Sequence, residues 1–206
     1  MRQNQYQKIL RLVEMAMLIA LVVVLQVFGG FFKVGPFSLS FVLIPIVIGS
    51  IIFDAKGGAF LGAVFGFVVI IQCATGIDVG GNILWSINPL LTSLICLVKG
   101  AAAGFFPGII YKAITKKNNS NAFLAVAAVI ASVSAPIANT GLFLLGLSTC
   151  FNSTLIEWAG GTNVMVYILT GLVGINFIIE FAINLIVSPA ISTIINIVTK
   201  QIFKNK

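Results

Sequence analysis

The chain has 206 residues, of which 59% are hydrophobic and 8% are charged, and its mean hydropathy is +1.13. These values lie far outside the range of soluble domains and predict an integral membrane protein. The formal net charge is +7 and histidine is absent, which excludes imidazole catalysis and histidine metal sites. The three cysteines match no metal-site spacing and predict neither a metal centre nor a disulfide framework.

The first apolar segment, Leu12 to Phe28, follows a polar and basic N-terminus. It predicts a first membrane span. A secretory signal is the alternative, but the run is long and no small-residue cleavage site follows it. Ala16 and Ala20 lie four residues apart within this span, a small-residue spacing that lets another helix approach closely. Ordinary packing is the alternative reading of the pair.

Two further spans are predicted on either side of a tight polar turn at 54–57. The second span, Ser38 to Phe53, contains Pro45 and is short for a hydrocarbon core of about 30 Å. The third runs from Gly58 to Cys73. Its glycines recur every four residues and leave one helix face as bare backbone, which needs a close neighbour. They are Gly58, Gly62 and Gly66.

A polar and aromatic entrance, containing Trp85 and Asn88, precedes the predicted fourth span from Pro89 to Tyr111. Asparagine is a favoured N-cap and proline fits the first helical turn, so we place a helix start here. The positive dipole end of this helix is expected to face a cavity and to favour a polar ligand. The loop 74–87 before it is rich in glycine and suits a lid or a partly re-entrant cover.

The fourth span repeats the glycine spacing of the third, with Gly100, Gly104 and Gly108. Two spans with bare backbone faces are expected to pack on one another, and a partner protein is the alternative.

A fifth span, Ala122 to Leu147, follows the basic loop 112–121 and is interrupted by Pro136. Proline bends a helix and frees a carbonyl group, so this point is either a tolerated kink or a break that faces a polar site. Asn139 and Thr140 lie about one turn farther on.

A second mixed loop, 148–162, contains Trp158 and leads into a sixth span from Asn163 to Val187. The remainder, 190–206, has the pattern of an interfacial helix. Three polar residues of the sixth span recur every four positions and therefore share one face. They are Asn176, Glu180 and Asn184.

Six spans would place both termini on one side of the membrane. Lys33 is then the one cation in a loop on the opposite side, so the positive-inside rule assigns both termini to the cytoplasm. The net charge therefore needs no nucleic acid partner. The cations on the cytoplasmic side are Arg2, Lys8, Arg11, Lys56, Lys112, Lys116, Lys117, Lys200, Lys204 and Lys206.

Lys99 and Glu180 are the ionisable residues deepest in the predicted spans. Charges inside a membrane are costly and need partners. A structural ion pair between the two and the anchoring of a ligand by Lys99 are both consistent with their positions. A proton relay is disfavoured, since no chain of acidic residues accompanies them.

The chain carries no phosphate-binding loop, so it cannot use ATP by itself, and no nucleophile, carboxylate pair or metal cluster predicts an enzyme. An autonomous facilitative or ion-coupled transporter is possible, but 206 residues without an obvious inverted repeat is small for that architecture. A membrane-bound capture subunit that depends on another complex for energy fits better. A membrane scaffold is the third reading.

The sequence resembles the substrate-binding S components of energy-coupling factor (ECF) vitamin transporters, in the branch that includes the folate, riboflavin and pantothenate proteins. The similarity covers nearly the whole chain, because the motifs follow one another in order from the first span to the fifth. They are Ala16-x-x-x-Ala20, Ser38 to Pro45, Gly57-Gly58-Ala59-Phe60-Leu61-Gly62 with Gly66, Asn88-Pro89-Leu90 with Gly100 and Gly104, and Ala138-Asn139-Thr140.

The resemblance implies an S-component-like fold of six spans, with residues 1–206 as a single substrate-binding domain in a prokaryotic plasma membrane. It implies a vitamin-like substrate taken from a cavity open to the outside, and no metal or cofactor. It also implies association, through the face with Ala16 and Ala20, with a transmembrane coupling protein that carries two ATPases.

Pantothenate-type members look closest around Asn88 and Asn139, although such relatives often carry arginine where this chain has Cys96. The predicted ligand contacts are polar or aromatic residues of the entrance and the later spans. They are Trp85, Asn88, Thr92, Lys99, Asn139, Trp158 and Asn176. The tryptophans have interfacial anchoring as an alternative role. Capping and helix packing are the alternatives for the asparagines.

Overall fold

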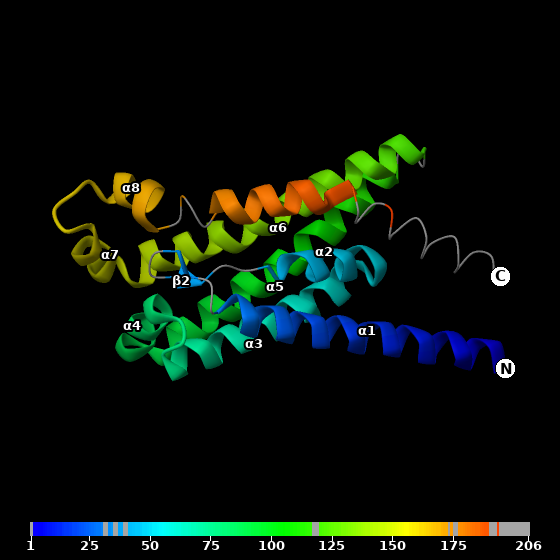
Figure 1. Ribbon diagram of the computed structural model, residues 1–206, viewed down its shortest axis with the longest axis horizontal. Helices are drawn as coiled ribbons and strands as arrows, with labels where there is room; N and C mark the ends of the chain where they lie inside the picture. The colour runs from blue at the N-terminus through cyan, green and yellow to red at the C-terminus, as the bar shows by residue number, and fades with distance from the viewer. Residues whose placement is uncertain are drawn as a thin grey trace.

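The computed structural model describes residues 2–30, 33–34, 37–38, 41–116, 120–172, 174, 177–189 and 193. Four of the described helices are long and apolar enough to cross a membrane, and they run along the long axis of the molecule (Figure 1). They are α1 (Arg2–Gly29), α3 (Asp54–Thr75), α5 (Pro89–Thr115) and α6 (Asn121–Cys150). The structure thus confirms the all-α membrane class that composition predicts.

Helix α1 begins at Arg2 and so includes the polar N-terminus that was expected to precede the span. Two buried glutamines join its far end to α3. Gln26 Nε2 donates to Gln72 Oε1 at 2.8 Å, and Gln72 Nε2 donates to the Gln26 carbonyl at 3.1 Å. Because an unpaired amide is costly between apolar helices, this exchange fixes how α1 sits on α3.

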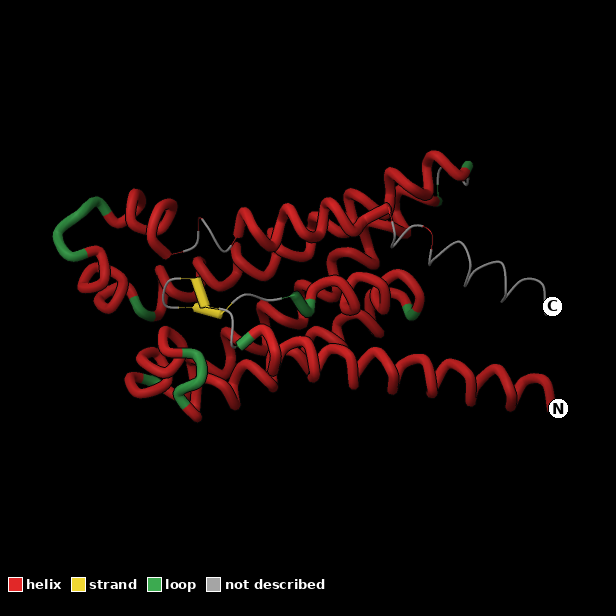
Figure 2. The backbone as a smooth tube through the Cα atoms, in the orientation of Figure 1, coloured by secondary structure: helices red, strands yellow, loops and turns green. Residues whose placement is uncertain are grey.

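The predicted length of the second span, Ser38 to Phe53, is wrong. Strands β1 (Lys33–Val34) and β2 (Phe37–Ser38) form a small antiparallel pair, yellow in Figure 2, so the chain is extended at Ser38. Helix α2 (Leu43–Ile52) has only 10 residues, which is about 15 Å of helix and half of a hydrocarbon core. Pro45 lies in its first turn, where the missing N–H removes no helical hydrogen bond.

The polar turn expected at 54–57 is also wrong, because α3 begins at Asp54. The chain reverses at Phe53 and Asp54, and Asp54 has a positive φ of 63°. Its carboxylate accepts a hydrogen bond from Lys112 Nζ at 3.2 Å, which links the start of α3 to the last turn of α5. Both side chains are exposed, so this ion pair adds little stability.

Helices α3 and α5 cross with their backbones in contact. A methyl group added at Gly62 would overlap the carbonyl of Gly100, and one at Gly58 would overlap the carbonyl of Gly104. Ser50 of α2 reaches the same place and donates to the Gly104 carbonyl at 2.6 Å. The expectation that the two glycine-rich spans pack on one another is therefore confirmed.

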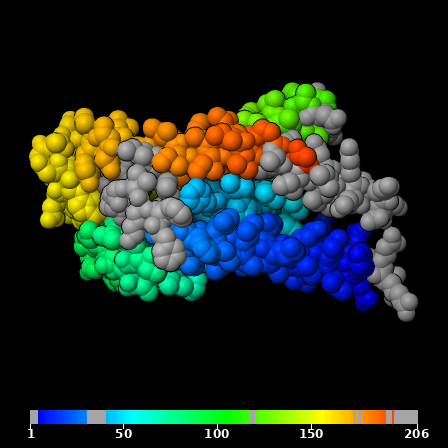
Figure 3. Space-filling model, viewed as in Figure 1, coloured from blue at the N-terminus to red at the C-terminus, as the bar shows by residue number. Residues whose placement is uncertain are grey.

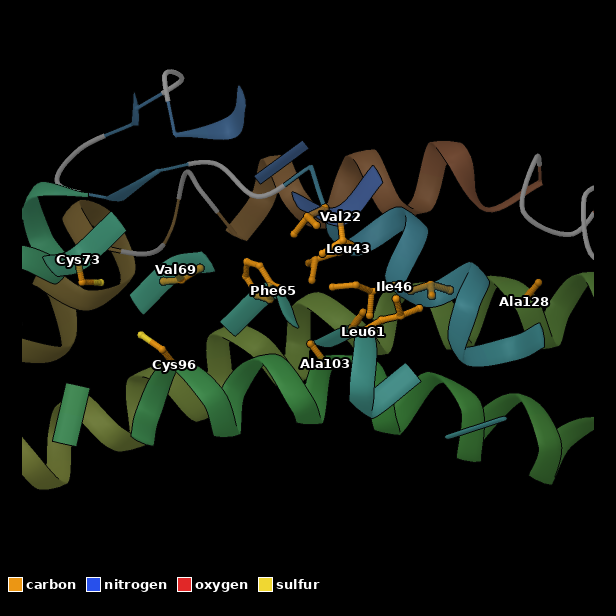
Figure 4. Packing of buried hydrophobic residues seen from close by; sticks show 13 residues of the cluster. Val22, Leu43, Ile46, Leu61, Phe65, Val69, Cys73, Cys96, Ala103 and Ala128 are labelled. Carbon is orange, nitrogen blue, oxygen red and sulfur yellow. The ribbon is translucent and has the colours of Figure 1, made fainter. Parts of the chain in front are cut away.

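The main hydrophobic core lies where α1, α2, α3, α5 and α6 meet (Figure 4). Short side chains predominate on α5 and α6, and larger ones fill the space from α2 and α3. Among those labelled in Figure 4 are Val22, Leu43, Ile46, Leu61, Phe65, Ala103 and Ala128. This core holds α3 and α5 at the spacing that the site requires.

Two segments expected as loops are helical. The segment 74–87 contains α4 (Val79–Ile87), and 148–162 contains α7 (Asn152–Ala159). Their glycines and polar residues suggested loops, but each helix buries apolar side chains. A second apolar cluster at this end of the molecule joins them to α6 through Leu84, Leu147, Phe151 and Leu155.

Helix α6 continues through Pro136, so of the two alternatives the tolerated proline holds and the break does not. The sixth predicted span is described in pieces, as α8 (Val164–Tyr167), the π-helical turn η1 (Ile168–Leu172) and a helix Phe177–Pro189. Val187 of the last helix packs against the main core. Of the predicted interfacial helix 190–206, only residue 193 falls within the described part.

Candidate functional site

A cavity opens at the end of the bundle that carries α4 and α7. The empty space here is ≈ 310 Å³, a figure that includes open solvent at the mouth. Helices α3, α4, α5 and α6 each contribute to the wall. The lining residues are Val69, Cys73, Asp78, Gly81, Leu84, Thr92, Ile95, Cys96, Lys99 and Phe143.

Helix α4 forms one wall because it is tied back onto α3. Asn82 Nδ2 donates to the Cys73 carbonyl at 2.8 Å, near the C-terminal end of α3. The Asp78 N–H donates to the Gln72 carbonyl at 3.2 Å. A side chain at Gly81 would overlap the Cys73 sulfur, so only glycine lets the two helices come this close. The region expected as a lid thus forms one wall of the cavity in this structure.

Lys99 brings a positive charge to the cavity. Its Nζ lies 4.8 Å from the centroid of the Phe143 ring, within the range of a cation–π contact. The alternative pair of Lys99 with Glu180 stays a prediction. Glu180 is buried in the helix Phe177–Pro189, and its backbone carbonyl accepts a hydrogen bond from Asn184 Nδ2 at 2.8 Å.

The start of α5 forms as predicted, and Asn88 caps it. Asn88 Oδ1 accepts a hydrogen bond from the Leu91 N–H at 3.1 Å, with Pro89 in the first turn. Thr92 lines the cavity one turn later, and its hydroxyl donates to the Asn88 carbonyl at 2.9 Å. Thr92 and Lys99 thus come together in one cavity, whereas Asn88 caps the helix and is not part of the lining.

The two predicted tryptophans lie outside the lining. Trp85 is half-buried and packs on the main core, and Trp158 is half-buried against the cluster that joins α4, α6 and α7. Both therefore help to hold the walls in place.

Asn139 is buried on α6, four residues before Phe143, and is also outside the lining. Its Oδ1 has no hydrogen-bond partner, which is unusual for a buried amide oxygen. Asn176 lies outside the described residues.

Two cysteines of the wall were not predicted as site residues. Cys73 and Cys96 both line the cavity, and Figure 4 shows their side chains at the same end of the core. Cys150 is exposed. The sequence held a signal for Cys96 and Thr92, because they continue the four-residue spacing of Gly104 and Gly100 outward along α5. Asp78 and Phe143 gave no such signal.

Groups of three or more residues suited to a metal ion are absent from the part of the chain that the structure describes. The wall has one cationic side chain, one carboxylate, two thiols and one hydroxyl among apolar groups. Such a set suits binding of a small polar molecule by hydrogen bonds and charge.

Ala16 and Ala20 lie on the exposed side of α1, away from the cavity wall. Large apolar side chains such as Val13, Met17 and Val24 are also exposed there. In Figure 3, α1 is uncovered along much of its length on the face shown.

Comparison with known proteins adds two findings. A family model described as "ECF transporter, substrate-specific component" matches residues 10–192. The chain is also similar to the pantothenic acid transporter PanT of Lactococcus lactis subsp. cremoris. The two are 29% identical over 189 residues, which cover 86% of this chain and 89% of that protein.

Proposed function

The chain belongs to the family of substrate-specific components of ECF transporters, and on this premise we propose that it captures a vitamin-like molecule, with pantothenate the first candidate. The main support for the proposal is the cavity at one end of the bundle, which both Lys99 and Thr92 line together with apolar residues. The similarity to the pantothenic acid transporter of Lactococcus lactis supports pantothenate, whose carboxylate suits a cationic site.

We propose that the cavity faces the outside of a prokaryotic plasma membrane. In Figure 1 the N-terminus and the connection between α5 and α6 lie at the end opposite to α4 and α7. The basic residues Lys8, Arg11, Lys56 and Lys112 belong to that opposite end, which the positive-inside rule assigns to the cytoplasm. In this arrangement α2 and the helix Phe177–Pro189 complete six spans, and both termini are cytoplasmic.

Within residues 1–206, acting as one substrate-binding domain, each wall has a distinct role in this proposal. Lys99 meets the anionic group of the substrate, and Thr92 supplies a hydroxyl on the same side. Trp85, Asn88 and Trp158 hold the entrance in shape. Asn139, with its unpaired oxygen, and Asn176 are candidates for contacts deeper in the protein, made when the substrate is bound.

Energy for uptake is proposed to come from a partner. The protein is not an enzyme in this reading: it docks through the α1 face with Ala16 and Ala20 onto a transmembrane coupling protein that carries two ATPases. The alternative is an autonomous small transporter, which would move its substrate in vesicles that contain this chain alone.

The first test identifies the small molecule that the purified protein carries. We would denature the full chain after purification in mild detergent and identify released compounds by mass spectrometry. A stoichiometric vitamin supports capture. If the protein is empty, calorimetric titration with pantothenate decides, and a wild-type chain that binds no pantothenate contradicts the substrate assignment.

A matched pair of variants then tests the site. Lys99→Met removes the positive charge of the cavity, whereas Lys56→Met removes a positive charge from the opposite end of α3. We expect only Lys99→Met to weaken pantothenate binding, by roughly tenfold or more, because buried charge-assisted contacts are worth about 1.5–3 kcal/mol. Equal affinities of the two variants would remove Lys99 from the site.

A further inference from the structure

Lys99 lies beside an aromatic ring at the cavity. Lys99 lies on α5, within a helix long and apolar enough to cross the membrane, where a charge is costly unless it has a partner. Its observed partner is the face of the Phe143 ring, 4.8 Å away. An aromatic ring attracts a cation through its quadrupole but carries no net charge. The ring therefore stabilises the ammonium group without neutralising it.

Phe143 is held in place by the close approach of α6 to α5. Gly146, one turn farther along α6, lies against Ile95, and a methyl group there would come within 2.8 Å of the Ile95 side chain. The ring itself packs against the apolar cluster of Leu84 and Leu147. Because its surroundings fix the ring, the ring can fix the position of the ammonium group.

The carboxylate of the cavity comes from a different element than Lys99. Asp78 precedes α4 and is next to Gly81 and Cys73, whereas Lys99 follows Cys96 by about one turn on α5. The cavity is thus lined by a cation on α5 beside Phe143 and by a carboxylate that precedes α4. A substrate with a single anionic group is expected to place that group at Lys99 rather than at Asp78.

We infer that Phe143 is a positioning residue that presents Lys99 to the cavity and thereby makes the site prefer a carboxylate-bearing substrate to its uncharged analogue. This inference rests on the proposed function, since it concerns the same cavity and the same substrate. Phe143 acts through Lys99, so its effect should be confined to ligands that carry the negative charge.

Pantothenate and pantothenyl alcohol make a suitable pair of probes, because they differ only in a carboxylate and a hydroxymethyl group. We would titrate both into the full chain, purified in detergent and freed of ligand, by calorimetry at pH 7. The quantity of interest is the ratio of the two dissociation constants. Packing alone would change both constants together and leave the ratio unchanged.

We expect the wild type to prefer the acid by at least roughly tenfold. Phe143→Leu should weaken binding of the acid by about tenfold and leave the alcohol within about twofold, whereas Phe143→Tyr, which keeps the ring, should retain the preference. Lys99→Met should abolish it. If Phe143→Leu does not fold, as judged by its elution profile and melting temperature, Phe143→Met, of similar volume, replaces it.

Two results would overturn the inference alone: a wild type that binds acid and alcohol equally, or a Phe143→Leu chain in which both affinities fall by the same factor. A wild type that binds neither compound contradicts the proposed substrate, and the inference then fails together with it.

Discussion

At the scale of single residues, the two buried cysteines illustrate how position in the fold decides chemistry. Cys73 and Cys96 are 1% and 4% exposed, while Cys150 is exposed at the end of α6. A thiol must reach solvent to react with a bulky reagent, so burial protects the first two. Both also line the cavity that the substrate is proposed to enter.

We therefore predict unequal labelling of the three cysteines. A membrane-impermeant maleimide should modify Cys150 of the native protein at least about tenfold faster than Cys73 or Cys96, because only Cys150 is exposed. All three should react after denaturation in SDS. Peptide mass spectrometry after timed quenching measures each rate. Labelling of Cys73 as fast as that of Cys150 would show that the wall formed by α4 is open in solution.

At the scale of elements, the crossing of α3 and α5 positions the whole cavity. The same crossing that brings Gly62 to Gly100 brings Gly66 to the Cys96 carbonyl, at the inner edge of the cavity wall. A side chain at the crossing would force the helices apart and break contacts on both sides. Closely packed small residues are a principal source of helix association in membranes.

A matched pair of alanine variants tests this crossing. Gly62→Ala should lower the apparent melting temperature and reduce ligand binding, since its methyl group meets backbone that cannot move aside. Gly141→Ala on α6 places the same group where nothing lies within 4 Å. It should be neutral or stabilise by up to about 1 kcal/mol through helix propensity. Thermal unfolding in detergent compares the two, and equal melting temperatures would contradict the crossing.

At the scale of the whole molecule, the cavity and the exposed face of α1 are separate surfaces. The cavity lies between α3, α4, α5 and α6, whereas Ala16 and Ala20 lie on the outer side of α1. Binding of the substrate and docking of the partner should therefore be separable by mutation. This separation is what a capture subunit needs, because it must hold its substrate before it meets its energy source.

Ala16→Trp should disrupt association with the coupling protein and its ATPases and leave ligand affinity within about twofold, because a bulky ring prevents close helix approach. Ala74→Trp, also exposed but at the other end of the bundle on α3, is the control. Co-purification with a tagged coupling protein and calorimetry measure the two properties. Full retention of the complex by Ala16→Trp would exclude this face as the docking surface.

The features that the sequence by itself determined are those that depend on composition or on neighbours along the chain. Hydropathy placed the protein in a membrane, and Asn88 with Pro89 marked a helix start, because caps and proline act within one turn. The glycine spacing of Gly58 to Gly66 predicted a close helix neighbour, because a helix face without side chains lets another backbone approach closely.

Only the tertiary structure decided the features that depend on contacts between distant segments. The segments with α4 and α7 look like loops in the sequence, yet they are helices because the end of α6 buries their apolar sides. The partner of Lys99 is Phe143, 44 positions away, and no local pattern distinguishes this ring from other aromatic residues. Local sequence does not distinguish helix from loop in these segments, nor one aromatic partner of Lys99 from another. Packing between distant segments decides both, and it also forms the cavity.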